Sequence, residues 1–75
     1  MLLLNCKENG RYVVKNISAD KTATEKLRKL GFADGVKFFF LKKYPMGGAI
    51  VETEGVKIGM GVAVAEKIEV ETCEK

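Results

Sequence analysis

Apolar and polar residues alternate in short runs along most of this 75-residue chain. The clearest run covers residues 36–43, where one face of an extended chain would carry Val36, Phe38 and Phe40, and the other Lys37, Phe39, Leu41 and Lys43. A period of two in a segment rich in aromatic residues is typical of a β-strand with one buried face. Similar segments predict further strands at residues 11–17, 49–53, 56–60 and 67–72, and the start of another at residues 2–4.

One segment, residues 18–31, has a helical period instead. The i, i+4, i+7 spacing that marks one face of a helix is found for Ala23, Leu27 and Leu30. We expect this narrow apolar stripe to pack on the core, with contact between a partner and Leu27 and Leu30 as the alternative. The pattern predicts one α-helix over about residues 22–30.

Both ends of this helix carry recognisable signals. Thr22 and Glu25 have the spacing of a capping box, in which each side chain satisfies a free backbone N–H at the helix start. Gly31 suits the left-handed residue that ends many helices, and Phe32 would then fold back onto Leu27. The helix is therefore expected to stop sharply at Gly31.

Turn-forming residues separate the predicted strands. Turns are expected at Asn9-Gly10, Asp34-Gly35 and Glu54-Gly55, and a loop at residues 44–48, where a proline precedes two glycines. The result is five or six short antiparallel strands with one helix, in a chain whose length suits a single domain. Closing the strands into a small β-barrel would leave few exposed sheet edges.

The composition argues against an enzyme. The chain has no histidine, which removes the commonest general base and metal ligand near neutral pH. Its single serine, Ser18, has no neighbouring base to activate it. The net charge is +3, with ten Lys/Arg against four Asp/Glu in residues 1–43. This basic half could attract an acidic partner, but a dedicated nucleic-acid-binding domain is usually more basic.

Two cysteines, Cys6 and Cys73, lie near the two ends of the chain. No CxxC motif accompanies them, so we expect them to be small buried or exposed thiols in a reducing cytoplasm. A disulfide between them, or a metal shared between subunits, stays open. No run of about 18 apolar residues occurs, so the sequence predicts no transmembrane helix.

Phe39 is a candidate contact residue. If Phe38 and Phe40 face the core, Phe39 points outward beside Leu41. An exposed aromatic and aliphatic pair on a small domain often marks a contact surface. Coverage by the helix or a loop is the alternative.

Two segments resemble the FeoA family of small cytoplasmic proteins. The segment LRKLGF, residues 27–32, with Gly35 after it, is similar to the family's LRRLGL-x-PG stretch. The segment KKYPMGGA, residues 42–49, is similar to its basic pair followed by aPlGGP. Asp34 and Ala49 stand where the family usually has proline, and residues 59–61, GMG, replace its usual ALR.

The resemblance implies an SH3-like barrel that binds a FeoB-type ferrous iron permease and modulates it without catalysis or a resident cofactor. The implied location is the cytoplasm, with membrane contact only through the partner. We expect the partner-binding residues to be Lys42, Lys43, Tyr44, Pro45, Met46, Gly47, Gly48 and Phe39. Self-association through Phe39 and weak binding of a transition metal stay open.

Two alternatives to this function are also compatible with the sequence. The same SH3-like fold is the C-terminal domain of DtxR-type iron-dependent regulators. The protein could therefore be a stand-alone relative that binds a transition metal or a regulatory partner. A nucleic-acid-binding barrel is a third reading, and it predicts salt-sensitive binding to DNA or RNA.

Overall fold

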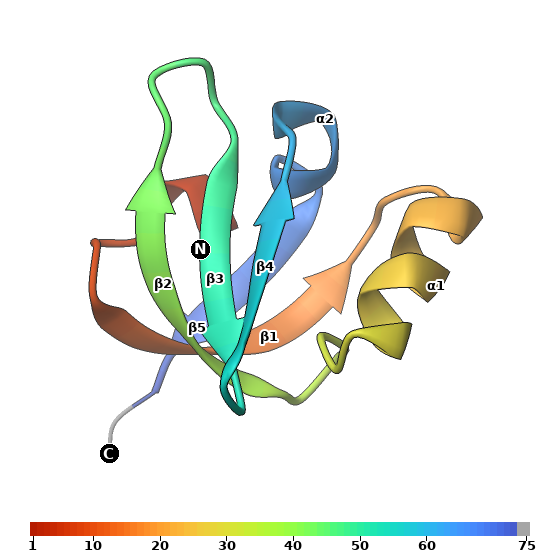
Figure 1. The fold of residues 1–75 in the computed structure, drawn as a ribbon, viewed down its shortest axis with the longest axis horizontal. Coiled ribbons are helices and arrows are strands. Elements are labelled where there is room, and N and C mark those ends of the chain that lie inside the picture. Colours follow the sequence, from red (N-terminus) through yellow and green to blue (C-terminus); the bar gives the residue numbers. More distant parts are fainter. Residues whose placement is uncertain (74–75) are drawn as a thin grey trace.

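The computed structural model describes residues 1–73 as one curled antiparallel sheet with a helix packed at its side (Figure 1). The strands are β1 (Gly10–Ile17), β2 (Lys37–Lys43), β3 (Ala49–Thr53), β4 (Val56–Met60) and β5 (Ile68–Thr72). The helices are the 3₁₀ turn η1 (Leu3–Asn5), α1 (Lys21–Lys29) and the single turn α2 (Val62–Ala65). The mainly β fold with one longer helix is confirmed, with five strands.

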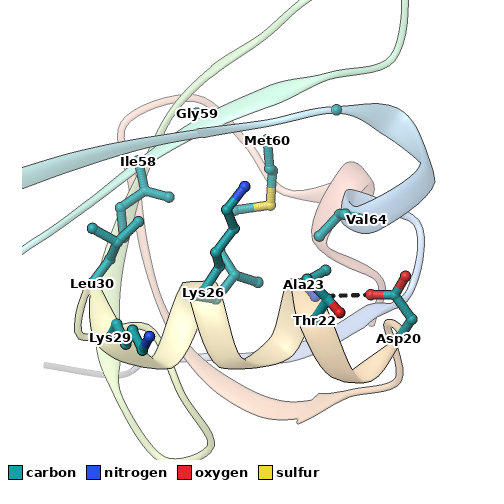
Figure 2. Close-up of a pocket in the computed structure, with 12 residues that line it drawn as sticks. Asp20, Thr22, Ala23, Lys26, Lys29, Leu30, Ile58, Gly59, Met60 and Val64 are labelled. Carbon is teal, nitrogen blue, oxygen red and sulfur yellow. Dashed lines mark hydrogen bonds between the residues drawn. The ribbon is translucent and has the colours of Figure 1, made fainter.

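The start of α1 differs from the prediction. Asp20 is the N-cap, and its carboxylate accepts a 2.8 Å hydrogen bond from the backbone N–H of Ala23 (Figure 2). The capping box of Thr22 and Glu25 was therefore wrong, because the helix begins one residue before Thr22. Asp20 is also among the residues that best accept from the free N–H groups of a helix start.

The end of α1 follows the prediction. The N–H of Phe32 donates to the carbonyl of Leu27, and that of Gly31 donates to Arg28, which is the Schellman pattern. Gly31 has a φ of 95°. Leu27 is buried as expected, but the core packing expected for Leu30 was wrong. Leu30 is 48% exposed, because it is the C-cap, where the chain turns away.

The strand order is β4-β3-β2-β1-β5, and every neighbouring pair is antiparallel. An extra residue, Lys15 in β1 and Leu41 in β2, interrupts the register of two pairs. Such bulges bend a strand and increase its local twist. They help this short sheet to curl around its core.

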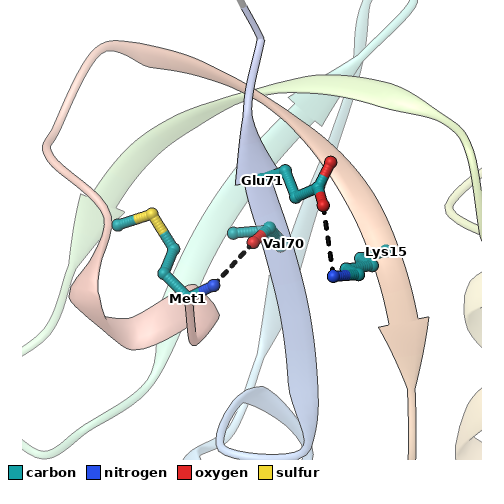
Figure 3. A network of polar contacts seen from close by, with 4 residues as sticks. All are labelled: Met1, Lys15, Val70 and Glu71. Atoms are coloured by element: carbon teal, nitrogen blue, oxygen red, sulfur yellow. Dashed lines mark hydrogen bonds and ion pairs between the residues drawn. The ribbon is translucent and has the colours of Figure 1, made fainter.

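One edge of the sheet, at β5, is partly hydrogen-bonded to the N-terminal residues. The N-terminal ammonium of Met1 donates to the carbonyl of Val70 at 2.9 Å (Figure 3). In return, the N–H of Val70 donates to the carbonyl of Met1 at 2.7 Å. The N-terminus therefore covers part of the β5 edge. The expected strand at residues 2–4 was wrong: Leu2 forms only an isolated bridge, and η1 turns Leu3 into the core, where it is fully buried.

The core lies on the concave side of the sheet. Phe38 is at its centre, with ring centroids 5.1 Å from Phe32 and 6.1 Å from Tyr12. The residues buried around them come from every strand, η1, α1 and α2, namely Leu3, Cys6, Val14, Leu27, Phe40, Ala49, Val51, Ile58, Ala65, Ile68 and Val70. The alternation in the sequence thus identified the buried face of the sheet.

The bulge at Leu41 moves Lys43 to a face that simple alternation does not predict. Lys43 pairs with Ala49, which is fully buried, so Lys43 lies on the core side at the end of the sheet. Its ammonium donates to the carbonyl of Leu4 at 3.0 Å. Placing Lys43 on the outer face with Phe39 was therefore wrong, because one extra residue inverts the facing of all that follow.

Candidate protein-interaction surface

The predicted loop at residues 44–48 is a tight, well-bonded hairpin connection. The N–H of Gly47 donates to the carbonyl of Tyr44 at 2.9 Å, and the N–H of Tyr44 donates to the carbonyl of Gly48 at 2.8 Å. Pro45 and Met46 lie between them, and proline has the fixed φ that suits the second position of such a turn. The loop therefore presents its tip on a rigid base.

The two glycines of the loop are required by its packing on α2. Gly47 has a φ of 102°, and a Cβ there would lie 2.8 Å from Cγ2 of Val62. At Gly48 a Cβ would lie 2.9 Å from the carbonyl oxygen of Met60. Both positions need a residue without a side chain, so the GG pair is a structural feature of this loop.

The tip of the loop exposes apolar and basic groups together. Met46 is 89% exposed, and Tyr44 and Val62 are also exposed. The ammonium of Lys42 lies 5.5 Å from the centroid of the Tyr44 ring, within reach of a cation–π attraction. An apolar side chain on a rigid turn with a cation nearby is suited to binding another protein.

Phe39 is exposed as predicted but lies apart from the loop. It is 42% exposed on the convex face, with the guanidinium of Arg11 5.3 Å from its ring centroid. In the β2–β3 register Phe39 pairs with Glu52 and Lys42 pairs with Ile50, so the bulge at Leu41 makes Phe39 and Lys42 neighbours on the convex face. Tyr44 is five positions further along the chain than Phe39, at most about 17 Å away at about 3.3 Å per residue. The structure therefore places Lys42 next to Phe39 on the convex face and Lys43 on the core side, with Phe39 away from the tip of the loop at Met46.

A groove that sequence reasoning missed lies between α1 and β4. It has a volume of about 640 Å³ and is lined by residues of α1, β4 and α2. The signal available in the sequence was Leu30, an apolar residue next to Gly31 at the end of the helix. Its place in the apolar stripe predicted core packing instead. The groove forms because α1 lies next to β4, and these two elements are about thirty residues apart in the sequence, so local patterns do not reveal it.

Both cysteines are free thiols, Cys6 buried and Cys73 half-buried. Burial raises the pKa of the Cys6 thiol to about 11, against smaller opposing effects of the N-terminal ammonium and a hydrogen bond with Tyr12. Within residues 1–73, no three side chains of His, Cys, Asp or Glu gather closely enough to hold a metal ion. In the same part of the chain, no helix is long and apolar enough to cross a membrane.

Solved structures place this fold in a known class. The structure of FeoA from Chlorobium tepidum is 28% identical, with a TM-score of 0.89 over 99% of this chain and 71% of that one. FeoA from Stenotrophomonas maltophilia complexed with zinc, described as a prokaryotic SH3 domain protein, is 24% identical, with a TM-score of 0.74 over 95% and 89%. ScaR with bound Zn²⁺ is 23% identical, with a TM-score of 0.83 over 97% of this chain and 37% of that one. The curled five-stranded sheet is thus an SH3-like domain.

The particular family follows from the sequence profile of the FeoA domain, which matches residues 1–72. This chain belongs to the FeoA family, as its LRKLGF and KKYPMGGA segments indicated. A comparison with curated protein sequences finds no match. The likeness to ScaR, at 23% identity, concerns the fold alone.

Proposed function

We propose that this protein is a cytoplasmic accessory factor of ferrous iron transport that binds the cytoplasmic part of a FeoB-type permease through residues 42–48. Membership of the FeoA family supports the transport role. The Stenotrophomonas maltophilia relative is described as a candidate bacterial ferrous iron transport activating factor. The observation that carries the choice of surface is Met46, whose side chain is 89% exposed at the tip of a bonded turn.

The mechanism is binding and not catalysis. Docking of the loop on one conformation of the permease would shift the permease toward that conformation, by as much as the loop binds it better than the alternatives. A rigid loop favours such docking because little conformational entropy is lost on binding. Lys42 adds a positive charge beside the apolar tip, which favours an acidic rim on the partner.

Calorimetric titration of the cognate permease's cytoplasmic domain with this protein tests the proposal. We expect binding for the wild type and at least a tenfold weaker affinity for Met46→Asp, because the change puts a charge at the centre of the contact. Val56→Asp is the matched control, since Val56 is also exposed and apolar but lies at the β3–β4 turn. The proposal would be refuted if the folded wild type did not bind the permease domain at concentrations on the order of tens of micromolar. It would also be refuted if Met46→Asp and Val56→Asp lost the same amount of affinity.

A further inference from the structure

The groove beside α1 has an apolar floor and is open to solvent. Leu27 and Ile58 form the buried part of this floor, and Met60 and Val64 extend it toward α2 (Figure 2). Leu30 stands at one end, 48% exposed. A volume of about 640 Å³ is within the usual range of binding pockets. The accessible apolar surface of the groove is thus provided by Leu30, Met60 and Val64, which residues 1–73 leave at least partly uncovered.

One wall of the groove is an unpaired strand edge. Among the strands formed by residues 1–73, β4 is at the end of the strand order and pairs only with β3. Their two-residue turn has positive φ at Glu54 and Gly55, as in a type I′ hairpin, so Thr53 and Val56 form its hydrogen-bonded closing pair. Because hydrogen-bonded and non-hydrogen-bonded pairs alternate, the N–H and C=O groups of residues 57 and 59 point away from β3. Within residues 1–73 these groups bond to no other backbone group.

The opposite edge of the sheet, at β5, differs from the β4 edge because it is partly covered. At β5, Met1 already occupies the corresponding position with two hydrogen bonds to Val70. At β4 no segment of residues 1–73 does so. An unpaired edge is a template for another strand.

The charges around the groove are mainly positive. Lys26 and Lys29 line its α1 side, and Figure 2 shows Lys26 reaching from α1 toward Met60. Lys57 lies exposed on the convex side of β4, opposite Glu52 of β3. The one acidic lining residue among residues 1–73, Asp20, already accepts the N–H of Ala23 as the helix cap. The groove is therefore complementary to a segment that carries carboxylates.

We propose that an extended acidic segment of a partner protein adds to β4 as a sixth strand. Its backbone pairs with the free groups of residues 57 and 59. Its apolar side chains, at alternate positions, face Leu27 and Leu30, and the carboxylates between them lie on the convex side with Lys57. Lys26 and Lys29 attract the negative charge of the segment from across the groove. This surface goes beyond the proposed function, because it lies outside the 42–48 loop and does not depend on the permease.

A fluorescein-labelled octapeptide that alternates valine with glutamate is the probe, measured by fluorescence anisotropy against the full chain. We expect saturable binding that weakens with added salt. Lys29→Glu should weaken it about tenfold, because one attraction becomes a repulsion. Arg28→Glu is the matched control: it makes the same charge change in the same helical turn but lies outside the groove, so affinity should stay within about twofold. Circular dichroism checks that both variants are folded.

Backbone methylation of the probe separates strand addition from simple attraction to lysines. Methyl groups on alternate amides block one edge of the peptide only, so one of the two methylated peptides should lose binding and the other should keep it. Equal behaviour of the two, or equal binding when lysine replaces glutamate, would overturn the proposal. So would no binding of the original peptide at millimolar concentration.

Two further measurements distinguish the β4 groove from the 42–48 loop and from a dimer interface. Met46→Asp should leave affinity for the octapeptide unchanged, so that failure of the permease experiment and failure of this one are distinct results. Sedimentation of the protein alone should show a monomer. A dimer that the peptide dissociates would overturn the proposal, since a second copy would then be the natural occupant of the β4 edge.

Discussion

Gly47 provides a quantitative test of how the loop is held. A Cβ at this position would lie 2.8 Å from Cγ2 and 3.0 Å from Cβ of Val62, and the backbone has a φ of 102°. Forcing an alanine into the left-handed half of the φ range costs about 1–2 kcal/mol. The overlap with Val62 adds about 1–2 kcal/mol, at the lower end of overpacking costs. We therefore expect Gly47→Ala to lower the free energy of unfolding by about 3 kcal/mol.

Gly55 is the matched control for the backbone contribution. Its φ is 82°, but within the described residues, 1–73, no atom lies within 4 Å of a Cβ placed there. Gly55→Ala should therefore cost only the backbone part, about 1–2 kcal/mol. The difference between the two substitutions measures the contact with Val62.

A double-mutant cycle measures the same contact independently. Val62→Ala removes the closer of the two overlapping atoms, so it should recover about 1 kcal/mol in the Gly47→Ala background and nothing in the Gly55→Ala background. Thermal and urea unfolding are the assays, since a drop of about 3 kcal/mol in a domain of this size lowers Tm by roughly 12–24 °C. Equal costs at both glycines, with no coupling to Val62, would refute the packing of the loop on α2.

Three further predictions concern stability and the thiols. Leu27→Ala should destabilise the fold by about 3 kcal/mol and Leu30→Ala by less than about 0.5 kcal/mol, measured by urea unfolding, because only the first is buried. Asp20→Ala should cost about 1 kcal/mol through loss of the α1 cap, visible as a lower Tm. At about pH 8, mass spectrometry should find Cys73 alkylated by iodoacetamide and Cys6 unmodified until urea unfolds the chain, because burial raises the pKa of the Cys6 thiol to about 11. Equal alkylation of the two thiols in the folded protein would contradict this prediction. Since the folded state binds the Cys6 proton more tightly than the unfolded state, the contribution of the Cys6 thiol to stability is complete below about pH 9 and is lost as the pH rises toward 11.

The fold was predictable wherever the side-chain pattern reflects burial directly. Phe38 and Phe40 face the core and Phe39 faces solvent because a two-residue period has only one way to bury two of three aromatics. The stop at Gly31 was predictable because few residues adopt positive φ, so a glycine after a helical segment is informative. In both places one local rule decides the structure.

The errors arose where two local solutions compete or where distant segments meet. Asp20 and Thr22 are both good caps, and only tertiary packing decides which one begins α1. Alternation alone cannot show the extra residue at Leu41, yet this bulge carries Lys43 to the opposite face. The groove depends on α1 meeting β4, which no local pattern encodes. The sequence thus predicted the loop of the candidate surface, but neither the facing of its lysines nor the second surface.

The short helix α2 connects the two surfaces physically. Val62, at its start, lies against Gly47 in the loop, whereas Val64, two residues on, lines the groove on the other side. Ala65 anchors the same turn in the core, where it is fully buried. A single helical turn held at one point cannot move toward one neighbour without changing its distance from the other, because protein interiors are closely packed. Loop and groove therefore share one support, and substitutions at Val62 or Val64 affect both, whereas a change at the exposed tip, Met46, acts on the loop surface alone.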